Sequence, residues 1–179
     1  MINITKPVET LHHVNLLRNG RAGERTWRNF KGEGGPNNTP GNRNFTIGLD
    51  DEKAAELRSH GWPVRSKPDT RPGHEGEERH TLKVNVKYRT RDGREMKPPK
   101  IVVITRRNRT EYGENQVELL DFMEFSNVDV TLNAYPTVNS FTKEEMVGVS
   151  LMVMFATVEE DELTAEYNAR WEDEDTPFN

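Results

Sequence analysis

A run of basic side chains in the middle of the chain has the spacing needed to bind a polyanion. Residues 83–109 contain ten Lys and Arg against two Asp and Glu. In an extended strand Lys83, Lys87 and Arg89 share one face, and each two-residue step is about 6–7 Å. This spacing roughly matches successive phosphates on a single nucleic-acid strand, whose neutralisation releases counterions. A charged strand edge that resists aggregation is the alternative interpretation.

Further basic residues extend this candidate surface in both directions along the chain. Some follow the predicted strand in its turn and in the next strand, and others flank a Gly-rich segment at 31–44. They are Arg28, Lys31, Arg43, Arg91, Lys97, Lys100, Arg106, Arg107 and Arg109. Because the excess charge is nearly all of one sign, we favour a binding groove over an ordinary solvated face.

Binding of single strands also requires aromatic rings on which bases stack, each worth roughly 1–3 kcal/mol. Trp27 and Phe30 alternate with basic residues directly before the Gly-rich segment, and Tyr135 falls on the polar side of its predicted strand. Tyr112 follows the basic run closely. Packing in the core is the alternative for Trp27 and Phe30, whereas we assign Phe155 to the core.

The net charge of −5 averages two regions of opposite sign. Residues 158–179 hold nine acids and one base, so residues 1–157 keep 24 Lys and Arg against 21 Asp and Glu. Four consecutive carboxylates repel one another, so we expect a disordered tail over 168–179. An acidic strand with an aromatic tip suits docking onto a partner protein, and a solubilising tail is the alternative. The expected partner-binding residues are Glu172, Asp173, Glu174, Asp175, Pro177 and Phe178.

Patterns typical of enzymes are weak in this sequence. The absence of cysteine excludes disulfides, thiolate metal sites and a Cys nucleophile. The five histidines lack ligand spacing, and the chain has no phosphate-binding Gly-Lys-Ser/Thr motif. The acids at 159–162 could hold magnesium for a nuclease, but contiguous acids at a strand end point in different directions. We therefore expect no enzyme, no cofactor and no metal.

Most of the elements that would position these residues are strands. Apolar and polar residues alternate with the period of a half-buried strand in several segments. These are 45–49, 82–88 and 128–135, with shorter apolar runs at 101–104 and 147–158. Asp92-Gly93 predicts a hairpin that pairs 82–88 with 101–104. Since 147–158 is apolar on both faces, we expect it at the centre of the sheet.

Two short helices complete the expected fold. Asp50 caps the first, over 51–60, and Gly61 ends it in a left-handed conformation. The second spans 115–122. Strands joined mainly by turns predict a mainly β protein, an OB-like antiparallel barrel with long polar loops.

Length and composition set the domain organisation. We expect one domain over residues 1–167, followed by the tail. Only 32% of the residues are hydrophobic and 31% are charged, which predicts a small core dressed with polar loops. No run of about 18 apolar residues and no basic-then-apolar leader is present, so we expect a cytoplasmic protein.

Several short motifs resemble a family of small bacteriophage proteins across about residues 25–167. They are Trp27-x-Asn29-Phe30-x-Gly32, Gly41-x-Arg43-Asn44-Phe45, Leu49-Asp50, Gly61-Trp62, Pro99-x-Ile101, Asn127-Val128-Asp129-Val130 and Thr157-x-Glu159-x-Asp161-Glu162. Proteins of that family are regarded as single-stranded DNA-binding replication proteins with an OB-like fold. The acidic end also resembles the tip of bacterial single-stranded DNA-binding proteins, although this chain ends in Asn179 rather than Phe.

This resemblance implies a non-catalytic protein that holds single-stranded DNA during replication or recombination. It implies that the acidic tail recruits replication and recombination proteins, and it leaves a homodimer open. The main alternative is a phage interaction or inhibitor protein whose acidic tail mimics DNA. That alternative predicts no affinity for single strands and no salt-dependent quenching of Trp27 fluorescence.

Overall fold

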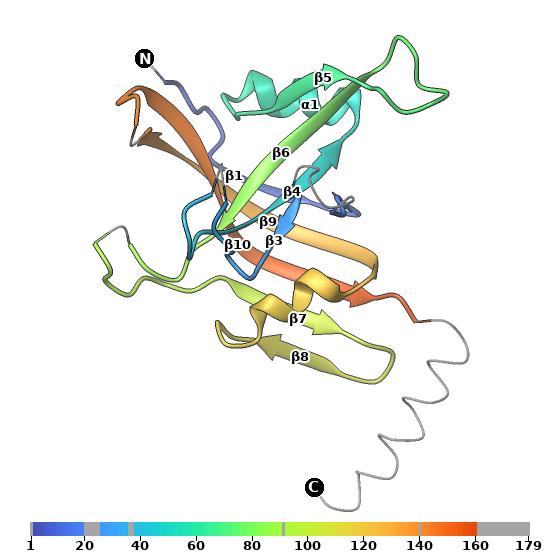
Figure 1. The fold of residues 1–179 in the computed structure, drawn as a ribbon, viewed down its shortest axis with the longest axis vertical. Coiled ribbons are helices and arrows are strands. Elements are labelled where there is room, and N and C mark those ends of the chain that lie inside the picture. The colour runs from blue at the N-terminus through green and yellow to red at the C-terminus, as the bar shows by residue number, and fades with distance from the viewer. Residues whose placement is uncertain (1, 20–25, 36–37, 91, 140, 161–179) are drawn as a thin grey trace, which may run out of the picture.

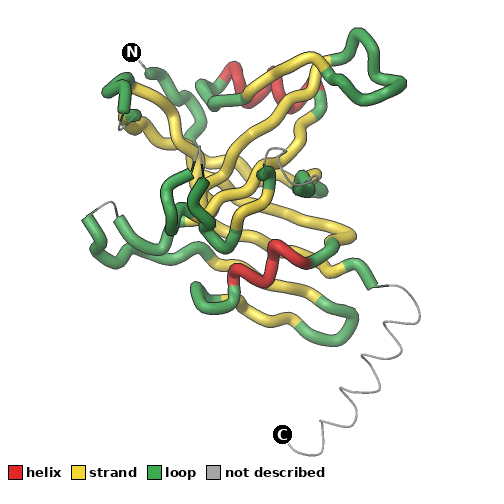
Figure 2. Tube along the Cα trace, viewed as in Figure 1, coloured by secondary structure: helices red, strands yellow, loops and turns green. Residues whose placement is uncertain are grey.

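The structure, a computed structural model, describes residues 2–19, 26–35, 38–90, 92–139 and 141–160, in which strands predominate (Figures 1 and 2). The strands in this part of the chain are β1 (Val8–Leu11), β2 (Asn15–Leu16), β3 (Arg28–Asn29), β4 (Arg43–Leu49), β5 (Arg65–Pro68), β6 (Glu78–Val86), β7 (Lys100–Ile104), β8 (Arg109–Tyr112), β9 (Phe125–Val138) and β10 (Glu145–Val158). The helices are α1 (Asp51–Ser59) and the 3-10 helix η1 (Val117–Phe122). Neither helix is long and apolar enough to span a bilayer, which holds for the described residues.

The strands form one mixed sheet with β10 at its centre. The main path through it is β1-β9-β10-β6-β4-β2, while β3 joins β4, β5 joins β6, and β8 joins β7. β9 pairs antiparallel with β10 along nearly its whole length, and β6 and β7 pair parallel with β10. Within the described residues these pairings leave the sheet open. The expected mainly β, OB-like fold and the central place of residues 147–158 are confirmed, with a mixed sheet in place of a purely antiparallel one.

The hairpin that we expected between residues 82–88 and 101–104 is wrong. Because β9 occupies one edge of β10, β6 and β7 must share the other edge, where each pairs with a different stretch of β10. β7 makes its hairpin with β8 instead. Asp92-Gly93 does form a turn, with Gly93 at a φ of 85°, but that turn lies inside the β6–β7 loop. A local turn signal carries no information on parallel pairing to a strand that comes later in the chain.

The core lies under the inward faces of the long strands. Leu82, Val84 and Val86 alternate inward along β6 and are almost fully buried. The even-numbered β9 residues from Val128 to Ala134, including Val130 and Leu132, face the same core. Burial of each such side chain contributes roughly 1.5–3 kcal/mol to stability.

One core assignment is wrong because of a bulge. Phe155 is only partly buried and pairs with Asp129, on the face turned away from the core. The register between β9 and β10 shifts between Leu151 and Val153. An extra residue reverses the alternation, so the buried positions are Leu151 before the shift and Met154 after it.

The caps of α1 are as predicted. The Asp50 carboxylate accepts the Lys53 backbone N–H at 2.7 Å, and Gly61 has a φ of 88°. Trp62 follows, buried, and its indole N–H donates to the Lys6 carbonyl oxygen at 2.9 Å. The end of the helix is thereby tied to the segment before β1.

Candidate nucleic-acid interface

The sheet face turned away from the core carries a row of cations along β6. Arg79 and Lys83 lie on the face opposite Leu82 and Val84, and Lys87 continues the alternation one residue beyond the strand end. Successive cations are four residues apart, which is about 13 Å along an extended strand. Lys83 and Lys87 are exposed and Arg79 is partly exposed.

An aromatic ring lies beside the cation at each end of this row. The Arg79 guanidinium carbon lies 5.4 Å from the centroid of the Trp27 ring, and Lys87 Nζ lies 4.7 Å from the centroid of the Tyr135 ring. Trp27 is held next to β4, because its carbonyl oxygen accepts the Thr46 backbone N–H at 2.7 Å. Both rings keep part of their surface exposed. A cation over an exposed ring contributes about 0.5–1 kcal/mol.

The Tyr135 ring lies across the backbone of β10 at a glycine. Tyr135 pairs with Gly148, and a Cβ added to residue 148 would lie 2.6 Å from Tyr135 Cζ. Any side chain at this position would therefore push the ring away from the sheet. The glycine is what allows the ring to lie flat over the strand.

Uncharged polar side chains fill the middle of this face. Lys83 pairs with Thr46, and Asn85 pairs with Ser150, which in turn pairs with Asn133 on β9. Such side chains can exchange hydrogen bonds with bases or sugars without repelling phosphates. We call the surface made by Trp27, Arg79, Lys83, Asn85, Lys87, Tyr135 and Ser150 the β6 outer face.

The structure brings four of the predicted binding residues together on the β6 outer face. These are Trp27, Lys83, Lys87 and Tyr135. Arg79 was missed, because the predicted strand began only at residue 82. The signal that could have found it is the period of two, which continues from Lys87 back through Lys83 to Arg79.

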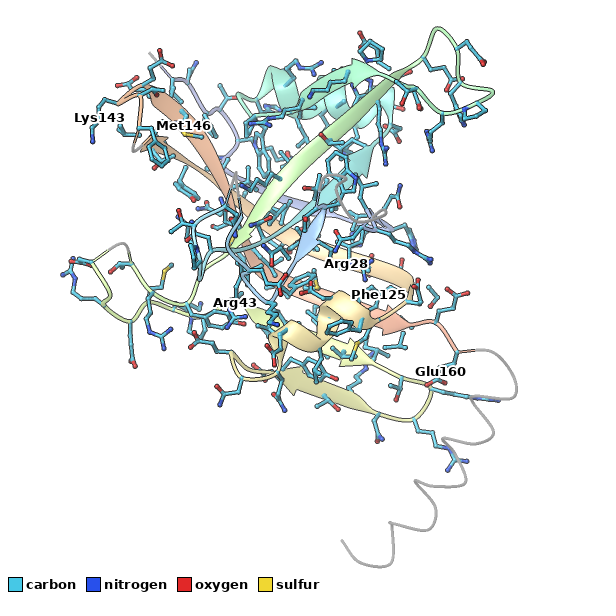
Figure 3. All side chains as sticks on the ribbon, in the orientation of Figure 1. Arg28, Arg43, Phe125, Lys143, Met146 and Glu160 are labelled. Atoms are coloured by element: carbon cyan, nitrogen blue, oxygen red, sulfur yellow. The ribbon has the colours of Figure 1, made fainter. Side chains whose placement is uncertain are left out.

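Two predicted contacts are wrong, because their side chains are buried. Phe30 has no exposed surface and stacks on Phe45 with 5.0 Å between ring centroids. Arg28 is 6% exposed, and its Nη1 donates to the carbonyl oxygens of Leu120 at 3.2 Å and Met123 at 2.6 Å. Its guanidinium also lies 5.4 Å from the Phe125 ring, which Figure 3 shows at the junction of β3 with η1. Burial lowers the pKa of Arg28 from its ordinary value.

Three other candidates are bound to groups of the protein itself. Arg43 Nη1 donates to the carbonyl oxygens of Phe30 at 2.6 Å and Lys31 at 3.2 Å. These hydrogen bonds close the base of the loop between Lys31 and Arg43. Lys31 Nζ lies 3.3 Å from a Glu33 oxygen. Arg89, which we expected on the same face as Lys83, lies beyond the end of β6 and donates two hydrogen bonds to Glu114 at 2.5 and 3.0 Å. These hydrogen bonds raise the pKa of Arg89.

The structure places Tyr112, a predicted stacking platform, partly in the core. It pairs with Ile101 and packs against the hydrophobic core, on the inward side of β8. Tyr112 is only partly exposed, so packing against the core leaves less of its ring for a base.

The other basic candidates form a second region on the β7–β8 hairpin and the loop before it. Lys100 begins β7, Arg106 and Arg107 stand in the turn, and Arg109 begins β8, all of them exposed, as is Lys97. The turn is one strand length, about 17 Å, from Lys100. Arg91 lies outside the described residues, as do the tail residues Glu172, Asp173, Glu174, Asp175, Pro177 and Phe178.

Two groups of side chains in the described residues have the composition of a metal site. They are Glu9 with Glu56 and His60, and Asp69 with His74 and Glu77. In the second group hydrogen bonds from Arg71 hold the pKa of Asp69 well below its usual range.

Comparisons with known proteins give one family and several solved structures. The family model, described as "Putative phage ssDNA-binding domain", matches residues 15–176. No curated protein sequence matches the chain.

Among similar structures, the single-stranded DNA-binding protein from bacteriophage Enc34 in complex with ssDNA is 10% identical, with a TM-score of 0.48 over 87% of this chain and 88% of that chain. A C-terminal truncation of the Enc34 protein is 8% identical, with a TM-score of 0.45 over the same shares. The third is gp2.5, a single-stranded DNA-binding protein encoded by bacteriophage T7. It is 13% identical, with a TM-score of 0.34 over 88% of this chain and 95% of that chain.

Proposed function

The chain belongs to the family of phage ssDNA-binding domains, and we propose from this premise that it binds single-stranded DNA through the β6 outer face without sequence preference. The observation that carries this proposal is the row of three cations with an aromatic ring at each end. Cations that follow a backbone and rings on which any base can stack are the two parts that sequence-independent binding requires.

In this mechanism Arg79 and Lys87 move off the Trp27 and Tyr135 rings to meet phosphates, Lys83 meets a third phosphate, and bases stack on the two rings. Asn85 and Ser150 lie between them and bind sugars or base edges through hydrogen bonds. The exposed cations of the β7–β8 hairpin, together with Lys97 and Lys100, extend the path along which the DNA strand is bound. No bond is made or broken, so the protein is not an enzyme and acts by holding the strand and keeping it from pairing.

The biological role that this supports is in phage DNA replication and recombination in the host cytoplasm. The binding domain would span residues 1–167, and the acidic tail 168–179 would recruit replication and recombination proteins through its carboxylates and Phe178. Negative charge in the tail also disfavours a second role as a DNA-binding element, since phosphates repel it.

One titration tests the proposal against its alternatives. A labelled oligothymidine is titrated with the full chain at two salt concentrations, with and without magnesium, and its fluorescence anisotropy is followed. We expect binding that weakens steeply with salt and does not depend on magnesium. Absence of affinity would favour a DNA mimic and refute the proposal, and magnesium-dependent cleavage of the oligonucleotide would identify a nuclease instead.

A further inference from the structure

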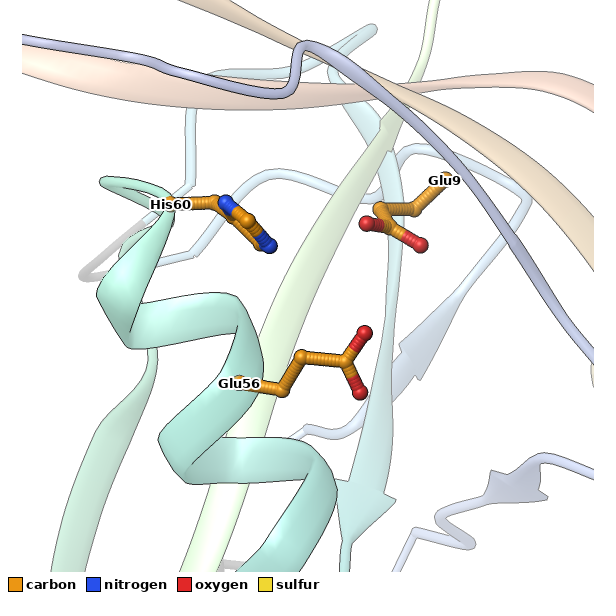
Figure 4. Close-up of side chains that lie close together, drawn as sticks. All are labelled: Glu9, Glu56 and His60. Atoms are coloured by element: carbon orange, nitrogen blue, oxygen red, sulfur yellow. The ribbon is translucent and has the colours of Figure 1, made fainter.

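The end of α1 and the edge strand β1 bring three metal-ligating side chains together, apart from the residues proposed to bind DNA. Figure 4 shows Glu9 of β1 facing Glu56 and His60 of the helix end. One ligand atom of each residue lies within 4.8 Å of those of the other two. The same two segments are joined by a hydrogen bond from the Thr5 backbone N–H to the His60 carbonyl oxygen at 3.1 Å.

The helix orients two of these side chains. Glu56 and His60 are four residues apart, so both lie on one face at the end of α1. Thr5 Oγ1 lies 2.9 Å from His60 Nδ1, which fixes the imidazole ring. Nε2 is thereby left as the nitrogen that points toward the two carboxylates (Figure 4). A hydrogen bond on the outer ring nitrogen is the usual way in which a metal-binding histidine is oriented.

Glu9 supplies a second, independent sign of a cation. Its side chain is only 6% exposed, and within the described residues its Oε1 accepts no hydrogen bond. Lys6 Nζ lies 3.0 Å from that oxygen, as an ion pair without hydrogen-bond geometry, and the Lys6 side chain is itself 53% exposed. A buried carboxylate beside a second carboxylate requires positive charge close by.

Two lysines now provide that charge. Besides Lys6, Lys53 Nζ donates to Glu56 Oε2 at 2.8 Å. Both are long side chains that can swing into solvent, so a dication can take their place between the carboxylates. A dication also adds the bond to imidazole nitrogen that an ammonium group cannot make.

We propose that Glu9, Glu56 and His60 form a binding site for a divalent transition metal of the Zn²⁺ type. One imidazole nitrogen and two carboxylate oxygens match Zn²⁺, which commonly takes three protein ligands and a water, better than they match Mg²⁺ or Ca²⁺. The bound ion joins β1 to α1 and so stabilises the N-terminal edge of the sheet. This site goes beyond DNA binding and does not depend on it.

The test is a calorimetric titration of the full chain with Zn²⁺, compared with the variants Glu56→Gln and His60→Gln. Glu56 and His60 are partly exposed, so both variants are expected to fold, and circular dichroism checks this. We expect one equivalent of Zn²⁺ to bind the natural chain. Each variant should lose at least tenfold in Zn²⁺ affinity, since even replacing a residue that only orients a ligand usually costs that much. Zn²⁺ should also raise the Tm of the natural chain but not that of His60→Gln.

Two matched controls separate this site from its surroundings. Glu52→Gln removes an exposed carboxylate from the same helix, and His74→Gln removes the histidine of the second group. Both should bind Zn²⁺ as the natural chain does. Absence of Zn²⁺ binding, binding unchanged in Glu56→Gln and His60→Gln, or loss of binding in His74→Gln would each overturn the proposal.

Discussion

The β6 outer face and the junction of β3 with η1 both place an arginine beside an aromatic ring, and they use it differently. Arg79 lies 5.4 Å from the Trp27 ring, and Arg28 lies 5.4 Å from the Phe125 ring. Arg28 is buried and donates to two carbonyl oxygens. Arg79 is partly exposed, and no hydrogen bond or ion pair to its guanidinium occurs among the described residues.

From this difference we propose that burial, and not residue type, separates a DNA-binding cation from a structural one. Arg28 is buried and its Nη1 donates to two carbonyl oxygens, so a phosphate cannot reach it. Arg79 is partly exposed, so its donors are accessible to a ligand.

The largest effect should come from Arg28→Ala. The change leaves the carbonyl oxygens of Leu120 and Met123 without donors and opens a gap in the junction, so we expect the free energy of unfolding to fall by about 2–4 kcal/mol. Urea denaturation measures it. DNA affinity under folding conditions should change little. Unchanged stability with lost DNA affinity would mean that Arg28 is a DNA contact after all.

The next effect should come from the triple variant Arg79→Ala, Lys83→Ala, Lys87→Ala. Loss of three phosphate contacts should reduce the slope of log affinity against log salt by about 2, at about 0.7 for each contact with a single strand. The matched control removes the same charge from the β7–β8 hairpin through Arg106→Ala, Arg107→Ala and Arg109→Ala. If the β6 outer face is the binding surface, that control should lose less affinity, and a larger loss there would move the site to the hairpin.

Replacement of Tyr135 by Leu should cost roughly 1–3 kcal/mol of binding free energy, the contribution of one stacked base. The fold should be retained, since the ring lies on the outer face of the sheet. Tyr112→Leu is the control: it should lower thermal stability and leave affinity for the oligonucleotide unchanged. Anisotropy titrations and melting curves of both variants decide between these roles.

A smaller effect should follow from Gly148→Ala, which forces the Tyr135 ring off β10. We expect a drop in DNA affinity smaller than that of Tyr135→Leu. The decisive comparison is the double variant, in which Gly148→Ala should have no further effect on binding because the ring is already gone. Additive losses would show that Gly148 acts independently of the ring.

The smallest effect should come from Arg89→Ala. Its guanidinium is bound to Glu114 at the surface, and exposed ion pairs contribute little. Affinity for single-stranded DNA should fall less than it does for Lys83→Ala. An equal or greater fall would show that the pair with Glu114 opens to receive a phosphate.

Local alternation made much of this molecule predictable from its sequence. The period of two along residues 82–87 placed Leu82 inward and Lys83 and Lys87 outward, and Tyr135 was placed outward by the same rule. The caps at Asp50 and Gly61 were equally local. These features depend only on neighbours in the chain.

The features that were missed depend on distant partners. β6 and β7 each pair parallel with β10, and no local turn signal indicates that pairing. The bulge at Met152 turned Phe155 outward. Arg28 and Phe30 are buried because η1 and β4 cover them, which the adjacent residues cannot reveal. The metal-ligating cluster likewise needs β1 to meet α1.

The most direct test of the central claim is photo-crosslinking of a bromodeoxyuridine-substituted oligonucleotide to the full chain, followed by mass spectrometry of the joined peptides. The account predicts crosslinks at Trp27 and Tyr135, both lost when salt releases the strand. Crosslinks confined to the β7–β8 hairpin, with none at either ring, would contradict it.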